Sequence, residues 1–263
     1  RLRVRTREDV EVLDVPTTHV SRLVCFGSVG VGPSVRNWAM NSDVDVVFNS
    51  RRGNYQGILS TQARRSERVR QQVEILDTEV ELELARRIVA AKTSHQMTVL
   101  KRFNSPETSA EVTDAVMEMK ALLPRLGECG SIAEVMGIEG AAGAQYFGVY
   151  GKLFPEDLRF DRRSRRPPLD TANAGLSYLY TILLGEVVGA VVAAGLEPSI
   201  GVLHRDDGRR PSLALDLMEE LRPLVVDRVV LTAARQNRLK STDGHRKDGN
   251  EGILLTKSGR KTL

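Results

Sequence analysis

The sequence predicts an α+β protein with two domains, a small N-terminal β domain followed by a large all-α domain. Short alternating or β-branched segments, separated by Gly, Pro and polar residues, fill roughly the first sixty positions. Beyond Ser60, apolar residues recur every three or four positions instead. The 263 residues, 41% hydrophobic and 27% charged, suit a globular chain with a sizeable core. We place the domains at residues 1–62 and 63–263.

The predicted β domain consists of short strands and one short helix. Segments 1–7, 10–15, 20–26 and 43–50 carry the strand patterns. Gly32 and Pro33 precede a short helical turn that ends near Met40, because proline is favoured at the start of a helix. The segment RRGNYQG, residues 51–57, is typical of a turn.

The predicted helical domain begins with one long charged helix from Gln62 to Phe103, ended by Asn104-Ser-Pro106. A second helix covers 112–126, and a third starts after Gly130 and ends before Phe154-Pro155. The apolar stripe of the first helix is expected at Val69, Val73, Leu76, Val80, Leu84, Ile88 and Ala91.

The C-terminal half contains an apolar helix from about Asp170 to Gly195. Its length raises the question of a membrane span, but Glu186 interrupts it and its glycines suit close packing, so we expect a core helix and no membrane. Further helices are predicted over 212–221, with Ser212 as N-cap, and over about 225–236. Residues 238–252 are polar and predicted to be mobile. The last eleven residues show only a weak pattern of regular secondary structure.

Composition places the chain in the cytoplasm. Cys25 and Cys129 lie far apart without metal-ligand spacing, as in a reducing compartment. No signal peptide is visible. The net charge of +4 does not by itself indicate nucleic acid, so the distribution of charge matters more.

Two acidic stretches are candidates for chemistry. Glu139 of IEGAAGAQYF, residues 138–147, lies on an apolar helical stripe, and a buried carboxylate needs a partner. Asp216 and Glu219 are three residues apart, so they share one face of a helix, and His204 precedes them. Carboxylates and an imidazole suit a hard divalent cation. An arginine partner for Glu139 and a solvated face for the other two carboxylates are the alternatives.

Basic residues cluster in two places. DRRSRRPP, residues 161–168, holds four arginines, and residues 235–263 carry eight Lys/Arg against three Asp/Glu. Guanidinium groups bind phosphates through paired donors, so the first cluster is a candidate phosphate contact. The alternative for both clusters is a solubilising surface, which we favour for the tail.

These stretches, taken together, resemble the CRISPR-associated spacer integrases of the Cas-one (Cas1) family. The resemblance rests on IEGAAGAQYF, RRPPLDTANAGLSYLY and GVLHRDDGRRPSLALDLMEELRP, with weaker similarity in LARRIVAAKTSHQMTVLKR, ILLTKSGRK and FGSVGVGPSVRNWAM. It thus extends over nearly the whole chain. The combination of the first three blocks is specific, whereas each block alone is not.

The resemblance implies a DNA-joining enzyme that depends on Mg²⁺ or Mn²⁺. It implies that Glu139, His204 and Glu219 hold the metal, with Asp216 as a further catalytic residue and Asn173 beside the site. The family reaction is phosphoryl transfer, in which the 3′-hydroxyl of a prespacer attacks a phosphodiester at the edge of a CRISPR repeat. By analogy, the residues expected to contact DNA are Arg162, Arg163, Arg165, Arg166 and Arg222.

The resemblance also implies partners: double-stranded DNA, a second copy of the chain, and the small Cas-two (Cas2) protein in a heterohexamer. Some family members follow a fused Cas-four (Cas4) nuclease domain. The chain starts without Met or the expected opening strands, which is compatible with the integrase half of such a fusion. The last metal ligand is Glu here and Asp in some relatives. The alternative functions are a non-catalytic DNA-binding scaffold protomer and a metal-dependent nuclease that does not join strands.

Overall fold

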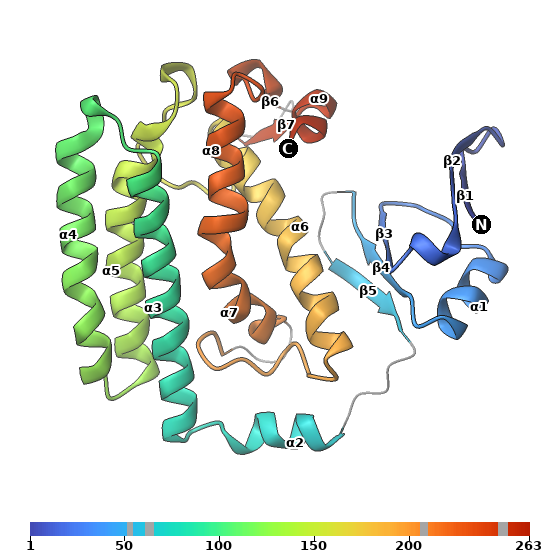
Figure 1. Cartoon of the computed structure of the whole chain (residues 1–263), viewed down its shortest axis with the longest axis horizontal. Coiled ribbons are helices and arrows are strands. Elements are labelled where there is room, and N and C mark those ends of the chain that lie inside the picture. Colours follow the sequence, from blue (N-terminus) through green and yellow to red (C-terminus); the bar gives the residue numbers. More distant parts are fainter. Residues whose placement is uncertain (52–54, 61–65, 206–209, 247–251) are drawn as a thin grey trace.

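A computed structural model describes residues 1–51, 55–60, 66–205, 210–246 and 252–263. It places a small β domain beside a larger helical domain, with α6 (Thr171–Ala193) lying between the two (Figure 1). The predicted α+β class is therefore confirmed. The predicted boundary at residues 62 and 63 lies outside the described residues.

The N-terminal domain contains a two-stranded antiparallel sheet, β1–β2, and a three-stranded sheet in the order β3-β4-β5. β4 is parallel to β3 and antiparallel to β5. We predicted a turn over residues 51–57, but Tyr55 and Gly57 already belong to β5 and pair with β4. Residues 52–54 lie outside the description. The elements are β1 (Leu2–Arg5), β2 (Glu11–Val15), β3 (Arg22–Phe26), α1 (Pro33–Asn41), β4 (Asp45–Asn49) and β5 (Tyr55–Leu59).

The helical domain confirms most of the predicted helices and adds a short hairpin. The segment predicted to be mobile contains β6, which pairs with β7, while residues 247–251 lie outside the description. Besides α6, the elements are α2 (Ser66–Glu74), α3 (Glu79–Arg102), α4 (Ser109–Arg125), α5 (Ile132–Tyr150), α7 (Ser212–Leu221), α8 (Arg228–Arg235), β6 (Gly244–Arg246), β7 (Ile253–Leu255) and α9 (Lys257–Thr262).

The long helix predicted over 62–103 contains two helices, and its predicted apolar stripe was wrong at Val73 and Val80, which are exposed. The chain breaks between α2 and α3, where Asp77 has a positive φ of 60°. The core face of α3 carries Leu82, Ala85 and Val89, whereas Val80 is 53% exposed. Leu84, Ile88 and Ala91 instead line a separate apolar cavity with residues of α7. Two apolar faces on one helix explain why periodicity alone selected the wrong one.

The helix after α7 also differs from the prediction. Residues Arg222–Asp227 form a π-helical stretch before α8 begins. Pro223 lacks a backbone N–H and disrupts the regular α-helical ladder there. Ser212 is the first residue of α7 rather than its cap, and its hydroxyl is buried without a hydrogen bond.

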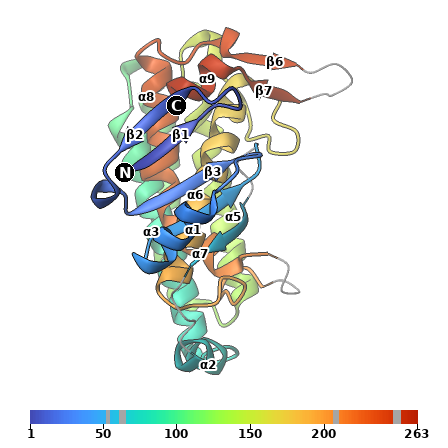
Figure 2. The same ribbon diagram turned by 90° about the vertical axis from the view of Figure 1, so that its right-hand side faces the viewer.

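The apolar helix α6 connects the two domains. It is long and apolar enough to cross a membrane, by length and composition alone. In the structure it packs against α7, α8, β4, β5 and β7. Figure 2, viewed from the β domain, shows the strands lying over it. Glu186, the charge that interrupts its apolar sequence, accepts a hydrogen bond of 2.6 Å from Arg22 of β3. A Cβ at Gly185 would lie 3.2 Å from the Asn49 side chain, so this glycine permits close approach of β4.

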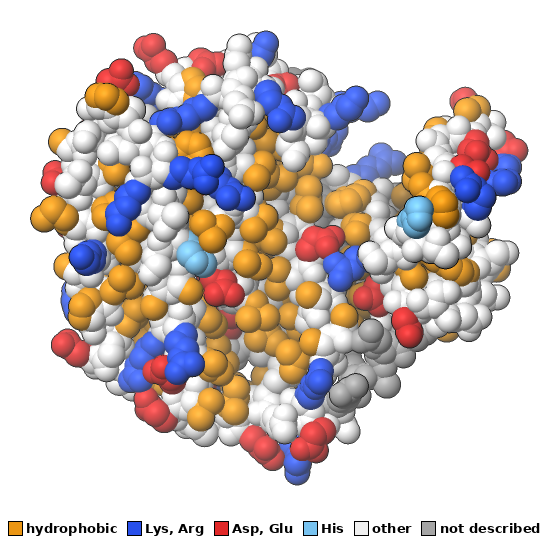
Figure 3. Space-filling view, in the orientation of Figure 1, with side chains coloured by type: hydrophobic (Ala, Val, Ile, Leu, Met, Phe, Trp, Pro, Cys, Tyr) orange, Lys and Arg blue, Asp and Glu red, His pale blue; other side chains and the backbone are white. Residues whose placement is uncertain are grey.

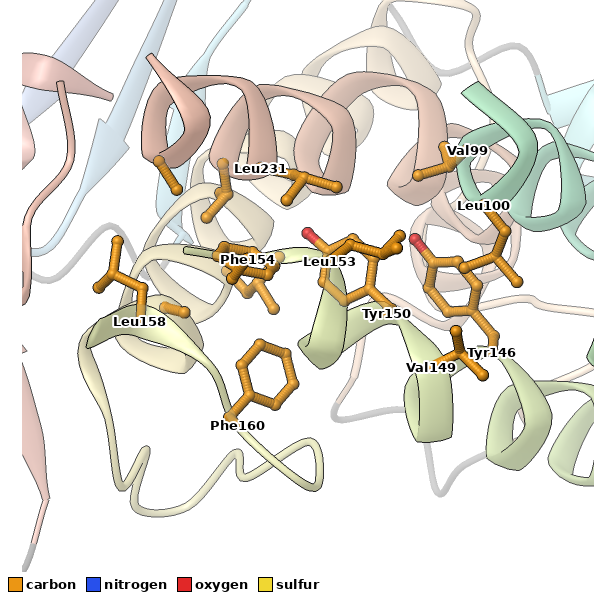
Figure 4. Close-up of a cluster of buried hydrophobic side chains, with 14 of the residues drawn as sticks. Val99, Leu100, Tyr146, Val149, Tyr150, Leu153, Phe154, Leu158, Phe160 and Leu231 are labelled. Atoms are coloured by element: carbon orange, nitrogen blue, oxygen red, sulfur yellow. The ribbon is translucent and has the colours of Figure 1, made fainter. Parts of the chain in front are cut away.

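An aromatic row forms the centre of the helical core (Figure 4). Tyr146 and Tyr150 of α5 stack with ring centroids 5.1 Å apart, and Phe154 and Phe160 continue the row. Both tyrosine hydroxyls donate to Asp227 at 2.9 Å, one to its carboxylate and one to its carbonyl. This polar link ties α5 to the end of the π-helical stretch, next to the candidate site.

Candidate functional site

Packing of three helices brings the predicted acidic residues into one region. α3 packs against both α5, which carries Glu139, and α7, which carries Asp216 and Glu219. His204 lies in the loop before α7, and the Glu219 charge acts on its imidazole. The structure therefore brings Glu139 into the same region as His204, Asp216 and Glu219, which lie more than sixty residues later in the sequence.

Lys92 of α3 lies between the two glutamates, and the sequence analysis missed it. Its ammonium forms a very short contact with Glu139 Oε1 and lies 2.5 Å from Glu219 Oε2. Its side chain is only 8% exposed. Lys92 lies at helical spacing from the core positions Ala85 and Val89, and this pattern could have indicated a buried lysine. The alternative partner predicted for Glu139 is an arginine. The partner in the structure is a lysine instead.

Glu219 is held ionised in a buried position. Arg222 Nη1 lies 2.5 Å from Glu219 Oε1, one turn along the chain. Burial would raise the pKa of Glu219, but Arg222 and Lys92 outweigh it and hold the pKa below its ordinary value. Glu219 Oε2 accepts no hydrogen bond of good geometry, although the Lys92 ammonium is close. This oxygen is a buried acceptor with spare capacity.

Asp216 fixes His204 rather than pointing at the two glutamates. Its Oδ2 accepts hydrogen bonds from the amides of Val202 (2.7 Å) and Leu203 (3.0 Å). Its Oδ1 accepts from the His204 amide at 3.0 Å and lies 2.8 Å from His204 Nδ1. The hydrogen bond to Asp216 raises the pKa of His204, against the effect of burial. Because Nδ1 is engaged, Nε2 is the nitrogen left to bind a ligand.

These residues fit a divalent cation in their chemistry. Two glutamates and a neutral imidazole form a donor set for Mg²⁺ or Mn²⁺, and a carboxylate behind the histidine is the usual second support. Beside its contact with the Lys92 ammonium, Glu219 Oε2 has a further lone pair for such a ligand bond. Among the described residues, no three His, Cys, Asp or Glu side chains already stand as a metal cluster. The Lys92 ammonium lies between the two glutamates instead.

For two of the predicted DNA-contacting arginines the structure gives a different role. Arg163 turns inward, donating to Asn173 Oδ1 at 2.8 Å and to the Ser177 hydroxyl at 3.0 Å, and burial lowers its pKa. Arg222 pairs with Glu219, and the two guanidinium groups lie 5.4 Å and 5.2 Å from the ring centroid of Tyr180. Both act as internal braces, because each guanidinium group already binds other side chains of the protein through its terminal nitrogens.

Asn173 anchors the arginine-rich loop to the start of α6. Its amide nitrogen donates to Arg162 O and Asp170 Oδ2, and its oxygen accepts from Arg163 and the Ser164 amide. All four hydrogen-bonding positions of the amide are therefore used. Its predicted place beside the metal stays a prediction, and its visible function is to hold the loop.

A basic groove of about 660 Å³ runs between α6, the arginine-rich loop and the C-terminal hairpin. No Asp or Glu is among the described residues that line it, and the Tyr178 ring forms part of its wall. Figure 3 shows the molecule hollowed beside the N-terminal strands, with Lys and Arg side chains over the upper part of the helical domain. The cations of the basic groove are Arg51, Arg165, Arg166, Lys257 and Arg260.

The chain is similar to one protein family along its whole length. A family model described as CRISPR associated protein Cas1 matches residues 1–263. CRISPR-associated endonuclease Cas1 2 of Rhodospirillum rubrum is 38% identical over 95% of this chain and 75% of its own length. A Cas4 exonuclease/Cas1 endonuclease fusion of Myxococcus xanthus is 35% identical over 93% of the chain but only 44% of the fusion.

Solved structures share the fold. A Cas1 protein from Thermotoga maritima aligns with a TM-score of 0.81 at 24% identity, covering 98% of this chain and 81% of that one. A chain of a Cas6-RT-Cas1–Cas2 complex aligns with a TM-score of 0.80 at 22% identity, over 99% and 29% of the two chains. A casposase bound to integration product aligns at 0.74 and 23% identity, over 92% and 68%.

Proposed function

Because the chain belongs to the CRISPR-associated Cas1 family, we propose that it is a CRISPR adaptation integrase. It joins the 3′-hydroxyl ends of a prespacer DNA to the leader-repeat of a CRISPR array by transesterification. The observation that carries this proposal is the arrangement of Glu139, Glu219 and His204, whose free Nε2 is set by Asp216. This combination is suited to phosphoryl transfer with a divalent cation.

In this proposal Glu139, His204 and Glu219 hold Mg²⁺ or Mn²⁺. When bound, the cation polarises the phosphoryl group and stabilises the negative charge that develops on it. Asp216 is a positioning residue, because it fixes the imidazole and the three amides around it. Arg222 keeps Glu219 ionised and in place, and stacks on Tyr180 to hold its own position.

We place the DNA backbone along the basic groove. Arg165 and Arg166 are exposed and form no ion pair among the described residues, so their guanidinium groups are available to phosphates. Tyr178 offers a ring on which a base stacks. The basic groove lies along Ala174–Thr181 of α6, and the same helix carries Tyr180, whose ring contacts Arg222. Arg162 is also exposed and completes the DNA-contacting set.

The partners are proposed from the family. One structural neighbour is titled as a complex with Cas2, which supports Cas2 as a partner of this chain. The heterohexamer of Cas1 dimers bridged by Cas2 is proposed from the family alone. The Myxococcus xanthus relative is a fusion with Cas4, which makes a Cas4 domain a candidate partner for this chain too. The site of action is the cytoplasm of a prokaryotic cell.

The alternative is a metal-dependent DNA endonuclease without joining activity. It is favoured by the name endonuclease carried by the Rhodospirillum rubrum relative. The proposed reaction and this alternative differ in product, because joining conserves the attacking strand within a longer molecule whereas cleavage only shortens the target.

The test is strand joining by the purified chain with its Cas2 partner, Mn²⁺, a prespacer with 3′-hydroxyl ends and a plasmid carrying a repeat. Glu139→Ala and His204→Ala should each reduce joined product to background, because each removes a proposed metal ligand. Glu118→Ala, an exposed glutamate on α4, is the matched control and should retain activity. Undiminished joining in both site variants would refute the assignment. Nicked plasmid without joined product would favour the endonuclease.

A further inference from the structure

We propose that Lys92 is an internal counter-cation that holds Glu139 and Glu219 together in the metal-free chain and competes with the divalent cation for them. The proposal rests on the metal site described under the proposed function. It assigns a function to a residue that the reaction scheme above leaves unused.

The position of Lys92 is unusual for a lysine. Its residue is 6% exposed, and its neighbours on the buried face of α3 include Val89, Thr93 and Gln96. Lysine is almost never fully buried without a partner, because desolvation of the ammonium is costly. Here the ammonium reaches carboxylates from two different helices, Glu139 of α5 and Glu219 of α7. Its ammonium therefore joins three helices at the site.

The lysine and the cation require the same atoms. Lys92 contacts Glu139 Oε1 and Glu219 Oε2, and the latter is the buried oxygen without a well-formed hydrogen bond. Glu219 Oε1 is already engaged by Arg222. A cation held by these two glutamates would be repelled by the nearby ammonium, so the two would compete for the carboxylate charge.

Lys92 rather than Arg222 is the cation suited to exchange. Arg222 is a planar group fixed between Glu219 and the Tyr180 ring. Lys92 has a flexible four-carbon stem and, among the described residues, its only ion-pair partners are the two glutamates. The charge that the carboxylates need is thus supplied by Lys92 before the metal binds and by the metal afterwards.

The test is the affinity of the full chain for Mn²⁺, measured by the electron paramagnetic resonance signal of free Mn²⁺ without DNA. Lys92→Met keeps the length of the stem and removes the charge, so it should bind Mn²⁺ about tenfold more tightly than the parent chain. Lys92→Arg should bind Mn²⁺ more weakly than the parent chain, because a guanidinium group binds carboxylates through two donors. Lys101→Met, an exposed lysine on the same helix, is the control and should match the parent.

A second readout is thermal unfolding. Without metal, Lys92→Met should unfold at a lower temperature, because two partly buried carboxylates lose their shared cation. Mn²⁺ should then raise its unfolding temperature more than that of the parent. The counter-cation proposal would be overturned if Lys92→Met bound Mn²⁺ no more tightly than the parent chain and Lys92→Arg bound it no more weakly. That result would not contradict the metal site itself. If the parent chain itself did not bind Mn²⁺, both the counter-cation proposal and the proposed metal site would be overturned.

Discussion

Replacing Asp216 with Asn tests whether this buried carboxylate organises the His204 loop. Each of its oxygens takes up two donor groups: Oδ1 is paired with the His204 amide and ring, and Oδ2 with the amides of Val202 and Leu203. Asparagine offers one acceptor oxygen and one NH₂ group. With Nδ1 of His204 protonated, two of the four donors face another donor whichever way the amide turns.

The magnitude follows from those two lost hydrogen bonds. A hydrogen bond to a charged group contributes about 1.5–3 kcal/mol, so the expected loss in the free energy of unfolding is about 3–6 kcal/mol. Asp216 is fully buried, so water cannot replace the missing partner. The typical stability of a protein is about 5–15 kcal/mol, which makes the change a large fraction of the total.

The assay is urea unfolding of the metal-free chain at pH 7.5, with Asp114→Asn, an exposed residue of α4, as the matched control. The control should change the free energy of unfolding by less than about 0.5 kcal/mol. A second readout is the pKa of His204 by NMR, which is practicable because the chain has only four histidines. Since Asp216 raises that pKa, the variant should lower it.

A loss below about 1 kcal/mol with an unchanged His204 pKa would refute the reasoning, because the weakest pair of charged hydrogen bonds contributes more than that. Loss of stability with an unchanged pKa would refute the part that links Asp216 to the histidine ring. The two measurements thus separate support of the loop from orientation of the imidazole.

Two further predictions concern the braces around the site. Burial raises the pKa of Asp227 to about 6, against the hydrogen bonds from Tyr180 and Tyr146. The folded chain therefore binds the proton more tightly than the unfolded chain, and this group makes stability fall by about 3 kcal/mol as pH rises from about 4 to 6. Asp227→Asn should remove that decline, measured as the difference between variant and parent in urea unfolding; an identical decline in both would contradict the assignment. Arg163→Ala should cost about 1.5–3 kcal/mol of stability through its lost internal hydrogen bonds. Arg165→Ala should leave stability unchanged but weaken DNA binding and reduce its salt dependence by about one phosphate contact, and the reverse pattern would contradict the assigned roles.

Local sequence patterns were sufficient for the fold class and for most helices. The glycines and the Pro at the ends of α5 marked a helix, and the predicted start of α6 near Asp170 is confirmed. The structure adds that Asp170 caps α6 by accepting from the Asn173 backbone N–H. The same patterns failed for α3, because a helix with apolar residues on two faces does not reveal which face meets the core.

The sequence by itself determined that Glu139 is a carboxylate on an apolar helix and that such a group needs a partner, since helical period and desolvation are local properties. It also placed Asp216 and Glu219 on one face of a helix, but it did not reveal that Asp216 binds the His204 loop. Only the tertiary structure decided what each carboxylate meets: Lys92 for Glu139, Lys92 and Arg222 for Glu219, and the His204 loop for Asp216. The physical reason is that a periodic pattern fixes the direction of a side chain on its own helix, whereas its partner depends on how α3, α5 and α7 pack.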